Sequence, residues 1–244
     1  MILSSLKVEL FADGAALEEM VAWYGRPWIR GFTTNPTLMR KAGVRDYRRF
    51  ARDVVAAIPD RPISFEVFSD RFDEMECQAK EIAEWGANVY VKVPVTDTTG
   101  RPSYDLVHRL SQSGVHVNVT AMLTLAQVAR AVEALAGGTS SFVSIFAGRI
   151  ADTGRDPVPI VRDAVATAAS APSVRVIWAS PRELLNVFHA EAAGCHVITM
   201  TTDLLGKLSL IGKDLDEFSL ETVKMFRADA LSAGFTLSGL GQLT

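Results

Sequence analysis

The chain has 244 residues, of which 48% are hydrophobic and 22% charged, and its formal net charge at pH 7 is −3. This composition excludes a mainly disordered chain, because disorder requires few apolar residues and a high net charge. The near-neutral charge also argues against general nucleic-acid binding, which requires a basic face. We expect a single globular domain over residues 1–244, since barrel domains commonly reach roughly 200–250 residues.

The N-terminal sequence MILSSLKVELFADG has no charged segment followed by a long apolar one, so it does not predict a signal peptide. No apolar run approaches the ~18 residues of a membrane span. We therefore expect a cytoplasmic protein without a membrane partner. The two cysteines, Cys77 and Cys195, show no CxxC spacing, and we expect both to be reduced, packed thiols.

Eight short apolar runs, rich in Val, Ile and Phe, alternate with amphipathic stretches. In chain order the runs are residues 7–14, 28–35, 61–68, 87–95, 114–120, 140–148, 173–180 and 195–200. They are short enough for buried strands. The spacing of apolar residues predicts helices over Arg45–Ala57, Phe72–Glu84, Thr124–Leu135, Pro157–Ala168 and Pro181–Ala192, and one additional C-terminal helix over Phe218–Leu231.

Apolar strands that alternate with helices indicate a parallel sheet covered by those helices. Eight such units within about 200 residues fit a (β/α)8 TIM barrel, followed here by the extra C-terminal helix. The alternative is a doubly wound open sheet. That fold commonly carries GxGxxG or GxxxxGK[ST] after a strand, and neither pattern occurs in this sequence.

In a barrel, the active site lies at the carboxyl ends of the strands. Polar residues stand at the predicted strand ends, in otherwise apolar runs. In chain order they are Asp13, Thr33, Thr34, Asn35, Glu66, Lys92, Asn118, Thr120, Ser144, Arg149, Ser180 and Arg182. This set of side chains is the candidate site.

Lys92 stands inside the apolar run VYVKVPV. A lysine in such a strand loses water, which favours the neutral amine, and a neutral amine can attack a carbonyl to form a Schiff base. Pro94 cannot donate to a sheet, so the strand should end near it, with Lys92 at the catalytic end. The alternative is a structural lysine paired with a buried carboxylate, and position alone leaves both open.

Two carboxylates accompany this lysine. Glu66 stands in a predicted strand, where it would act either as a general acid/base beside Lys92 or as the ion-pair partner of that lysine. Asp13 follows the first strand, and its alternative role is to cap the next helix. The residues alone leave both alternatives open.

Arg149, Ser180 and Arg182 follow the sixth and seventh strands. Arginine forks and helix N-termini bind phosphate, so these residues predict a phosphate site. Surface ion pairs are the alternative for both arginines. The four histidines form no HxxxH or HExxH pattern, so no metal site is predicted.

Several of these segments resemble the transaldolase family. The run FTTNPTL (residues 32–38) resembles its TTNP signature, and VYVKVPV (89–95) its Schiff-base lysine strand. NVT (118–120) resembles the family's N-x-T strand, SIFAGRI (144–150) its SPF-x-GRI segment, and ASPR (179–182) its AS-x-R segment. The matches keep the family's order from Asp13 to Arg182.

The resemblance implies a class I aldolase barrel that needs no metal or other cofactor, with Lys92 as the Schiff-base residue. Glu66 and Thr120, through a water, would move protons, and Asp13 would handle the proton of the hydroxyl next to the breaking bond. The residues that would hold the dihydroxyacetone unit are Thr34, Asn35, Asn118, Ser144 and Phe146. Arg149, Ser180 and Arg182 would hold the phosphate.

The implied reaction is transfer of a dihydroxyacetone unit from a sugar phosphate donor to an aldehyde acceptor, as in the pentose phosphate pathway. The fructose 6-phosphate aldolase subtype, which cleaves to free dihydroxyacetone, has Gln and Tyr where this chain has Glu66 and Phe146, so transfer is favoured. A non-catalytic sugar-phosphate-binding barrel is a remote alternative. Ile145, Pro181 and the loop Thr96–Ser103 depart from the family pattern near the phosphate and acceptor regions.

The family includes dimers and larger rings. We therefore expect a homo-oligomer, and the C-terminal helix Phe218–Leu231 is a candidate interface element.

Overall fold

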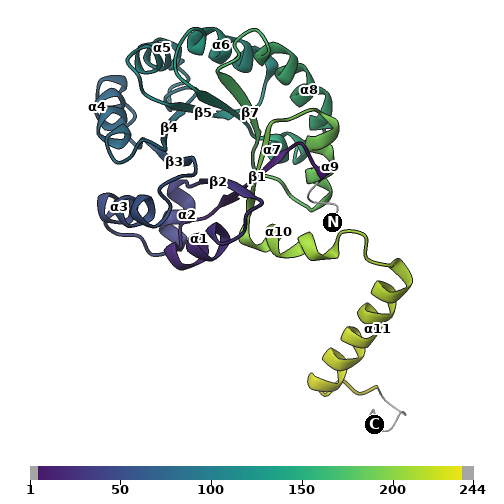
Figure 1. Cartoon of the computed structure of the whole chain (residues 1–244). Helices are drawn as coiled ribbons and strands as arrows, with labels where there is room; N and C mark the ends of the chain where they lie inside the picture. The colour runs from purple at the N-terminus through teal and green to yellow at the C-terminus, as the bar shows by residue number, and fades with distance from the viewer. Residues whose placement is uncertain (1–4, 238–244) are drawn as a thin grey trace. The chain divides into compact units, whose positions relative to one another are not determined.

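The structure is a computed structural model that describes residues 5–237. Its strands are β1 (Glu9–Asp13), β2 (Ile29–Thr33), β3 (Ile63–Glu66), β4 (Val89–Pro94), β5 (Val117–Met122), β6 (Ser141–Ile145), β7 (Val174–Trp178) and β8 (Val197–Thr201). Each strand pairs in parallel with the next, and β8 pairs with β1, so the sheet closes into a barrel (Figure 1). This confirms the predicted (β/α)8 barrel, and every strand overlaps one of the predicted apolar runs.

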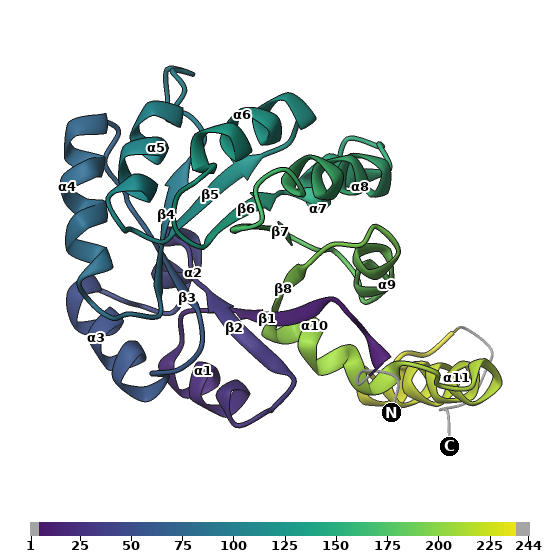
Figure 2. The ribbon, with the colours of Figure 1, turned by 45° about the horizontal axis from the view of Figure 1, so that its top comes forward.

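Figures 1 and 2 show the helices of the barrel unit outside the ring of strands. They are α1 (Leu17–Tyr24), α2 (Pro36–Lys41), α3 (Tyr47–Ala57), α4 (Phe72–Ala83), α5 (Tyr104–Gln112), α6 (Leu125–Leu135), α7 (Ala147–Ala151), α8 (Pro157–Ala168), α9 (Leu185–Ala192) and α10 (Thr202–Gly206). The chain continues with a 3-10 turn η2 (Lys207–Leu210) and α11 (Leu215–Ser232). Local signals fix several starts. Asp46 caps α3, and Thr124 and Gln127 form a capping box at α6.

The helix predicted over Pro181–Ala192 begins four residues late, at Leu185. Ser180 has a left-handed backbone, with φ of 60°, which turns the chain before a helix can form. The Asn186 side chain then accepts hydrogen bonds from the amides of Arg182 and Glu183. These bonds hold residues 180–184 as a turn, so Ser180 does not lie at a helix N-terminus as predicted.

The inside of the barrel is filled at the amino ends of the strands. Side chains two residues apart on a strand lie on the same face, so Phe11, Tyr90 and Phe142 lie one layer below Asp13, Lys92 and Ser144. Their rings pack together, with centroids 5.7 Å apart for Phe11–Phe142 and 4.5 Å for Tyr90–Phe142. We call this layer the closed end of the barrel.

Gly31 makes room for that layer. A Cβ at this position would lie 2.5 Å from the Phe11 ring, so any side chain there would displace the ring. Below the rings, Glu9 and Arg175 form an ion pair at 3.0 Å. The rings of the closed end therefore lie between this ion pair and the polar side chains at the carboxyl ends of the strands.

The two cysteines differ. Cys195 is buried, and desolvation raises the pKa of its thiol to about 12. Cys77 lies on α4 and is exposed, so the prediction of a packed thiol is wrong for this residue. A helical residue on the solvent-facing side of an amphipathic stretch has no core to enter.

The described chain divides into two units, one ending at Gly206 that holds the barrel and one beginning at Lys207 that holds η2 and α11. The helix expected over Phe218–Leu231 lies within α11, and none of the side chains of α11 is buried. A single domain over residues 1–244 stays a prediction. Within residues 5–237, no helix is long and apolar enough to cross a membrane.

Candidate active site

Lys92 and Glu66 meet at the carboxyl ends of neighbouring strands. They are register partners in the β3–β4 pair, and Lys92 Nζ lies 3.0 Å from Glu66 Oε2. The lysine is 6% exposed, and Nζ also donates to the backbone oxygen of Thr34 at 2.8 Å. The structural ion pair considered for Lys92 is therefore present. A pair in this place also holds an amine and an acid/base group within proton-transfer distance of each other.

Asp13 lies close to this pair. Desolvation raises the pKa of its carboxyl group, and the positive charge of Lys92 and a hydrogen bond from Thr33 oppose that rise. Thr33 Oγ1 donates to Asp13 Oδ1 at 2.7 Å. The helix-cap alternative for Asp13 is wrong, because α1 begins after Ala16 without any side-chain cap. Asp13 is instead a half-buried carboxyl group at the strand ends.

A row of hydrogen bonds crosses the barrel interior beside Lys92. Ser144 Oγ donates to Asn118 Oδ1 at 2.7 Å, and Asn118 Nδ2 donates to Ser64 Oγ at 3.0 Å. All three side chains are buried. The row fixes which way the Asn118 amide faces. Sequence reasoning did not include Ser64, although it stands two residues before Glu66 and so on the same strand face.

Thr120 places a hydroxyl group on β5, beside the end of β4. Its Oγ1 is buried, and it has no hydrogen-bond partner within the described part of the chain. In the β4–β5 pair, Lys92 is the register partner of Asn118 and Pro94 that of Thr120. The residue after Thr120, Ala121, has a left-handed backbone with φ of 65°. Within the described residues, Ser111 Oγ and Trp178 Nε1 also have no hydrogen-bond partner, but Thr120 is the one of the three that belongs to the candidate site.

Thr34 and Asn35 are engaged in backbone contacts. Thr34 Oγ1 donates to the backbone oxygen of Ser64 at 2.9 Å. Asn35 Oδ1 accepts from the amide of Leu38 at 2.9 Å and so caps α2. Thr34 reaches the reacting region through its backbone oxygen, which accepts from Lys92. The structure thus gives the Asn35 side-chain oxygen a role at the start of α2.

The three predicted phosphate residues form a second group, together with a carboxylate that was not predicted. Arg182 binds Asp152 through two bonds of 2.9 and 2.5 Å, and its Nη1 donates to Ser180 Oγ at 3.0 Å. The hydrogen bond from Arg182 lowers the pKa of Asp152, and the charge of Arg149 adds to this lowering. The ion pair considered as the alternative for these arginines thus exists for Arg182. Asp152 follows Arg149 by three residues, but its partner comes from the next loop.

Gly148 brings this group together. A Cβ at this position would lie 1.6 Å from the backbone oxygen of Ser180, so a side chain would displace the turn after β7. Phe146 is half-buried, packs against the rings of the closed end, and lies under Arg149 with 5.7 Å between the guanidinium carbon and the ring centre. Phe146 therefore connects the barrel interior with the arginine group. The described residues form no His, Cys, Asp and Glu group suited to a metal ion.

Residues 10–237 match the model of the family described as transaldolase/fructose-6-phosphate aldolase. The chain belongs to this family. A "Probable transaldolase" of Dehalococcoides mccartyi is 33% identical over 199 residues, which are 81% of this chain and 88% of the relative. A "Probable transaldolase" of Desulforudis audaxviator is 34% identical over 215 residues, covering 87% and 94%.

A solved structure supports the fold of this family member. The crystal structure of "a putative lyase/mutase from Burkholderia cenocepacia" superposes with a TM-score of 0.57 and 14% identity, and covers 97% of this chain and 90% of that one. At this identity the likeness shows the barrel alone.

Proposed function

We propose that this chain is a transaldolase that moves a dihydroxyacetone unit from a ketose phosphate to an aldehyde acceptor through a Schiff base on Lys92. The observation that carries the proposal is the buried lysine at the end of β4, 3.0 Å from the carboxylate of Glu66 and in the field of Asp13. Family membership and relatives named transaldolase support the same reaction.

In the proposed reaction, the neutral Lys92 amine adds to the ketone, and the resulting carbinolamine loses water to give an imine. Glu66, with Thr120 and a water, donates and accepts the protons of these steps. Asp13 removes the proton of the hydroxyl beside the carbon–carbon bond that breaks. The protonated imine takes up the electron pair of that bond as an enamine, and the rest of the donor leaves as an aldehyde. The enamine then adds to the acceptor aldehyde, and hydrolysis of the new imine releases the product ketose and the Lys92 amine.

The remaining residues hold the sugar. The Asn118–Ser144 hydrogen bond presents two oriented polar groups to the hydroxyls of the dihydroxyacetone unit, and Asn35 and Phe146 line the same unit. We assign the phosphate to Arg149, Ser180 and Arg182. Because Arg182 binds Asp152, the phosphate must compete with this carboxylate for the guanidinium group.

The second candidate is aldol cleavage to free dihydroxyacetone, because the family includes fructose-6-phosphate aldolases. Glu66 and Phe146 favour transfer. Release of dihydroxyacetone from fructose 6-phosphate at the same rate with and without an acceptor aldehyde would establish cleavage instead. A cytoplasmic location, a place in the pentose phosphate pathway and independence from metal ions belong to the same proposal.

We also propose a homo-oligomer in which α11 contributes to the interface. Seven large apolar side chains on this helix are exposed: Leu215, Phe218, Leu220, Val223, Met225, Phe226 and Leu231. Exposed large apolar side chains in this number on one helix are typical of a protein–protein contact. Light scattering of the full chain and of a variant with Val223 and Phe226 replaced by Ser tests this, and an unchanged mass excludes α11 from the interface.

Borohydride trapping with fructose 6-phosphate tests the catalytic proposal. We expect a reduced three-carbon adduct on Lys92, found by intact mass and peptide mapping. Lys92→Ala should lose the adduct, and Lys80→Ala, a change to an exposed lysine on α4, should keep it. An adduct that persists in Lys92→Ala would move the nucleophile elsewhere. Sugar-phosphate binding without any adduct in the unmodified protein would favour the non-catalytic barrel.

A further inference from the structure

The carbonyl group of Glu66 is not paired by the neighbouring strand. Along the β2–β3 contact, the amides of Phe32 and Thr34 donate to the oxygens of Pro62 and Ser64. The next donor in this series would be residue 36 and the next acceptor Glu66. Residue 36 is a proline, which has no N–H, and the chain turns there into α2. The oxygen of Glu66 therefore needs a donor from outside the sheet.

Tyr47 supplies that donor. Its hydroxyl donates to the backbone oxygen of Glu66 at 2.9 Å. Desolvation raises the pKa of this phenol, so the group keeps its proton at neutral pH. Tyr47 is the first residue of α3, and its ring packs edge-on against Phe65 and Trp85, with centroids 6.2 and 5.3 Å away.

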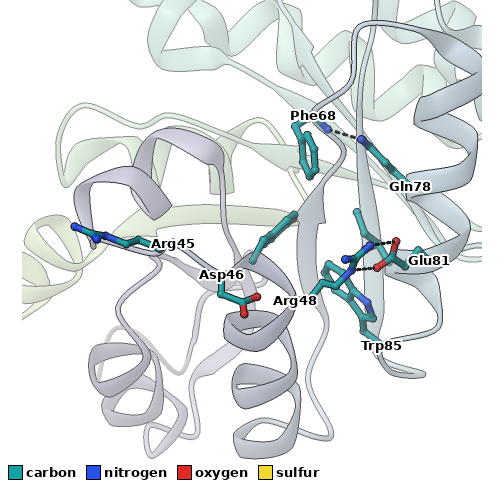
Figure 3. A pocket seen from close by; sticks show the side chains of 9 residues that line it. Arg45, Asp46, Arg48, Phe68, Gln78, Glu81 and Trp85 are labelled. Atoms are coloured by element: carbon teal, nitrogen blue, oxygen red, sulfur yellow. Dashed lines mark hydrogen bonds and ion pairs between the residues drawn. The ribbon is translucent and has the colours of Figure 1, made fainter.

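Tyr47 also borders a cleft of about 440 Å³ between α3 and α4, on the outside of the barrel. Figure 3 shows this cleft, with Phe68 and Trp85 on its walls and the Arg48–Glu81 pair at one side. The tyrosine therefore reaches from the outer surface to the backbone of a residue in the active site.

One peptide unit is held from both sides. The Glu66–Val67 peptide gives its N–H to the backbone oxygen of Lys92 at 3.1 Å and accepts the Tyr47 hydroxyl at its C=O. The Glu66 side chain begins at the α-carbon beside this peptide, and its carboxylate lies 3.0 Å from Lys92 Nζ. If the hydroxyl is removed, one of the two bonds that fix the peptide is lost.

We propose that Tyr47 is a positioning residue for the Glu66–Lys92 pair: through the Glu66–Val67 peptide, its hydroxyl holds the carboxylate at proton-transfer distance from the amine. The catalytic consequence rests on the proposed function. The geometric consequence does not, because it concerns only the contact between the Glu66 and Lys92 side chains.

The first test is Tyr47→Phe, which removes the hydroxyl and keeps the ring. We expect kcat for transfer to fall about tenfold, a fraction of the 10²- to 10⁴-fold that a placed acid/base group contributes. KM for fructose 6-phosphate should stay within about twofold, because the phosphate residues lie after β6 and β7. Tyr24→Phe is the matched control, since it removes an exposed hydroxyl that binds Asp60. A wild-type kcat in Tyr47→Phe would overturn the proposal.

The second test needs no sugar. A lysine-selective acylating reagent, read by peptide mapping, should modify Lys92 severalfold faster in Tyr47→Phe than in the unmodified protein, with Lys80 as the internal reference. An unchanged rate would overturn the positioning role. Faster labelling in a protein that traps no adduct would keep the positioning role and reject the proposed function.

Trp85→Phe separates the hydroxyl from the packing around it. This change loosens the ring contact and leaves the hydroxyl in place, so we expect a lower Tm with unchanged kcat and Lys92 labelling. If Trp85→Phe reproduces the kinetic effect of Tyr47→Phe at equal Tm, packing is the cause and the proposal fails.

Discussion

The two ends of the barrel interior are built from the same strands and differ in how their polar groups are paired. At the closed end, polar atoms have partners: Glu9 binds Arg175, and the hydroxyl of Tyr90 and the His116 ring both bind Ser140. At the carboxyl ends, desolvation raises the pKa of Asp13, and the Thr120 hydroxyl has no partner within the described residues.

Along each strand, the residues at the closed end stabilise the fold, and the residues at the carboxyl end form the candidate active site. A shift of two residues takes the chain from Phe11 to Asp13 and from Tyr90 to Lys92. The rings fill space and release water, which stabilises the fold. The charged groups are held out of water close to one another, which destabilises the fold and prepares proton transfer. Substitutions at the two ends should therefore affect different measurements.

The largest effect after loss of Lys92 is expected from Asp13→Asn. Loss of a placed acid/base group should lower kcat by about 10²- to 10⁴-fold. The same change should raise Tm at pH 7. Folding raises the pKa of the Asp13 carboxyl group. At pH values above its pKa in both the unfolded and the folded protein, the ionised group therefore destabilises the native state, and Asn removes that charge.

The pH dependence of Tm is a second test of whether the ionised Asp13 destabilises the fold. The difference in Tm between Asp13→Asn and the unmodified protein should shrink as pH falls toward 3.8, the ordinary pKa of the carboxyl group. Asp163→Asn on the exposed face of α8 is the control and should leave activity unchanged. A lower Tm for Asp13→Asn at pH 7 would contradict the desolvation argument.

A smaller effect is expected at the arginine group. Arg182→Ala should raise KM for fructose 6-phosphate by about tenfold or more and spare kcat, because it removes binding that the ground state and the transition state share. Asp152→Asn should act in the opposite direction and lower KM a few-fold, because it removes the carboxylate that binds Arg182. Equal KM values in all three proteins would remove Arg182 from the phosphate site.

The smallest kinetic effect is expected from a substitution at the closed end. Gly31→Ala places a Cβ 2.5 Å from the Phe11 ring, and we expect the free energy of unfolding to fall by about 1–3 kcal/mol. Steady-state kinetics at a temperature where the variant is folded should show kcat and KM unchanged. Gly206→Ala, where an added Cβ meets no atom within 4 Å, is the control for stability. A large loss of kcat in Gly31→Ala would mean that the two ends are coupled.

The sequence predicts the strands well, because a buried parallel strand needs a continuous apolar run, and a charged residue such as Lys92 stands out in one. The ends of helices are harder. Proline and an acidic cap mark the start of α8 at Pro157. The start of α9 depends on the left-handed backbone of Ser180 and on the side chain of Asn186, which no periodicity reveals.

In the candidate site, sequence reasoning finds residues by their position on strands and misses partners that come from other loops. Asp152 pairs with Arg182 from the preceding loop, and Tyr47 reaches Glu66 from α3. Both contacts link segments at least 19 residues apart along the chain. Such contacts depend on how the loops fold over the barrel, which the local pattern of apolar residues does not encode.

The backbone of Ser180 has a consequence for laboratory evolution. A residue other than glycine in the left-handed region destabilises the fold by roughly 1–2 kcal/mol, and here the Ser180 hydroxyl accepts a bond from Arg182 Nη1. A library randomised at position 180 and sorted for heat resistance should yield glycine. The same library sorted for turnover at limiting sugar phosphate should yield serine. The two screens would thus choose different residues at one codon.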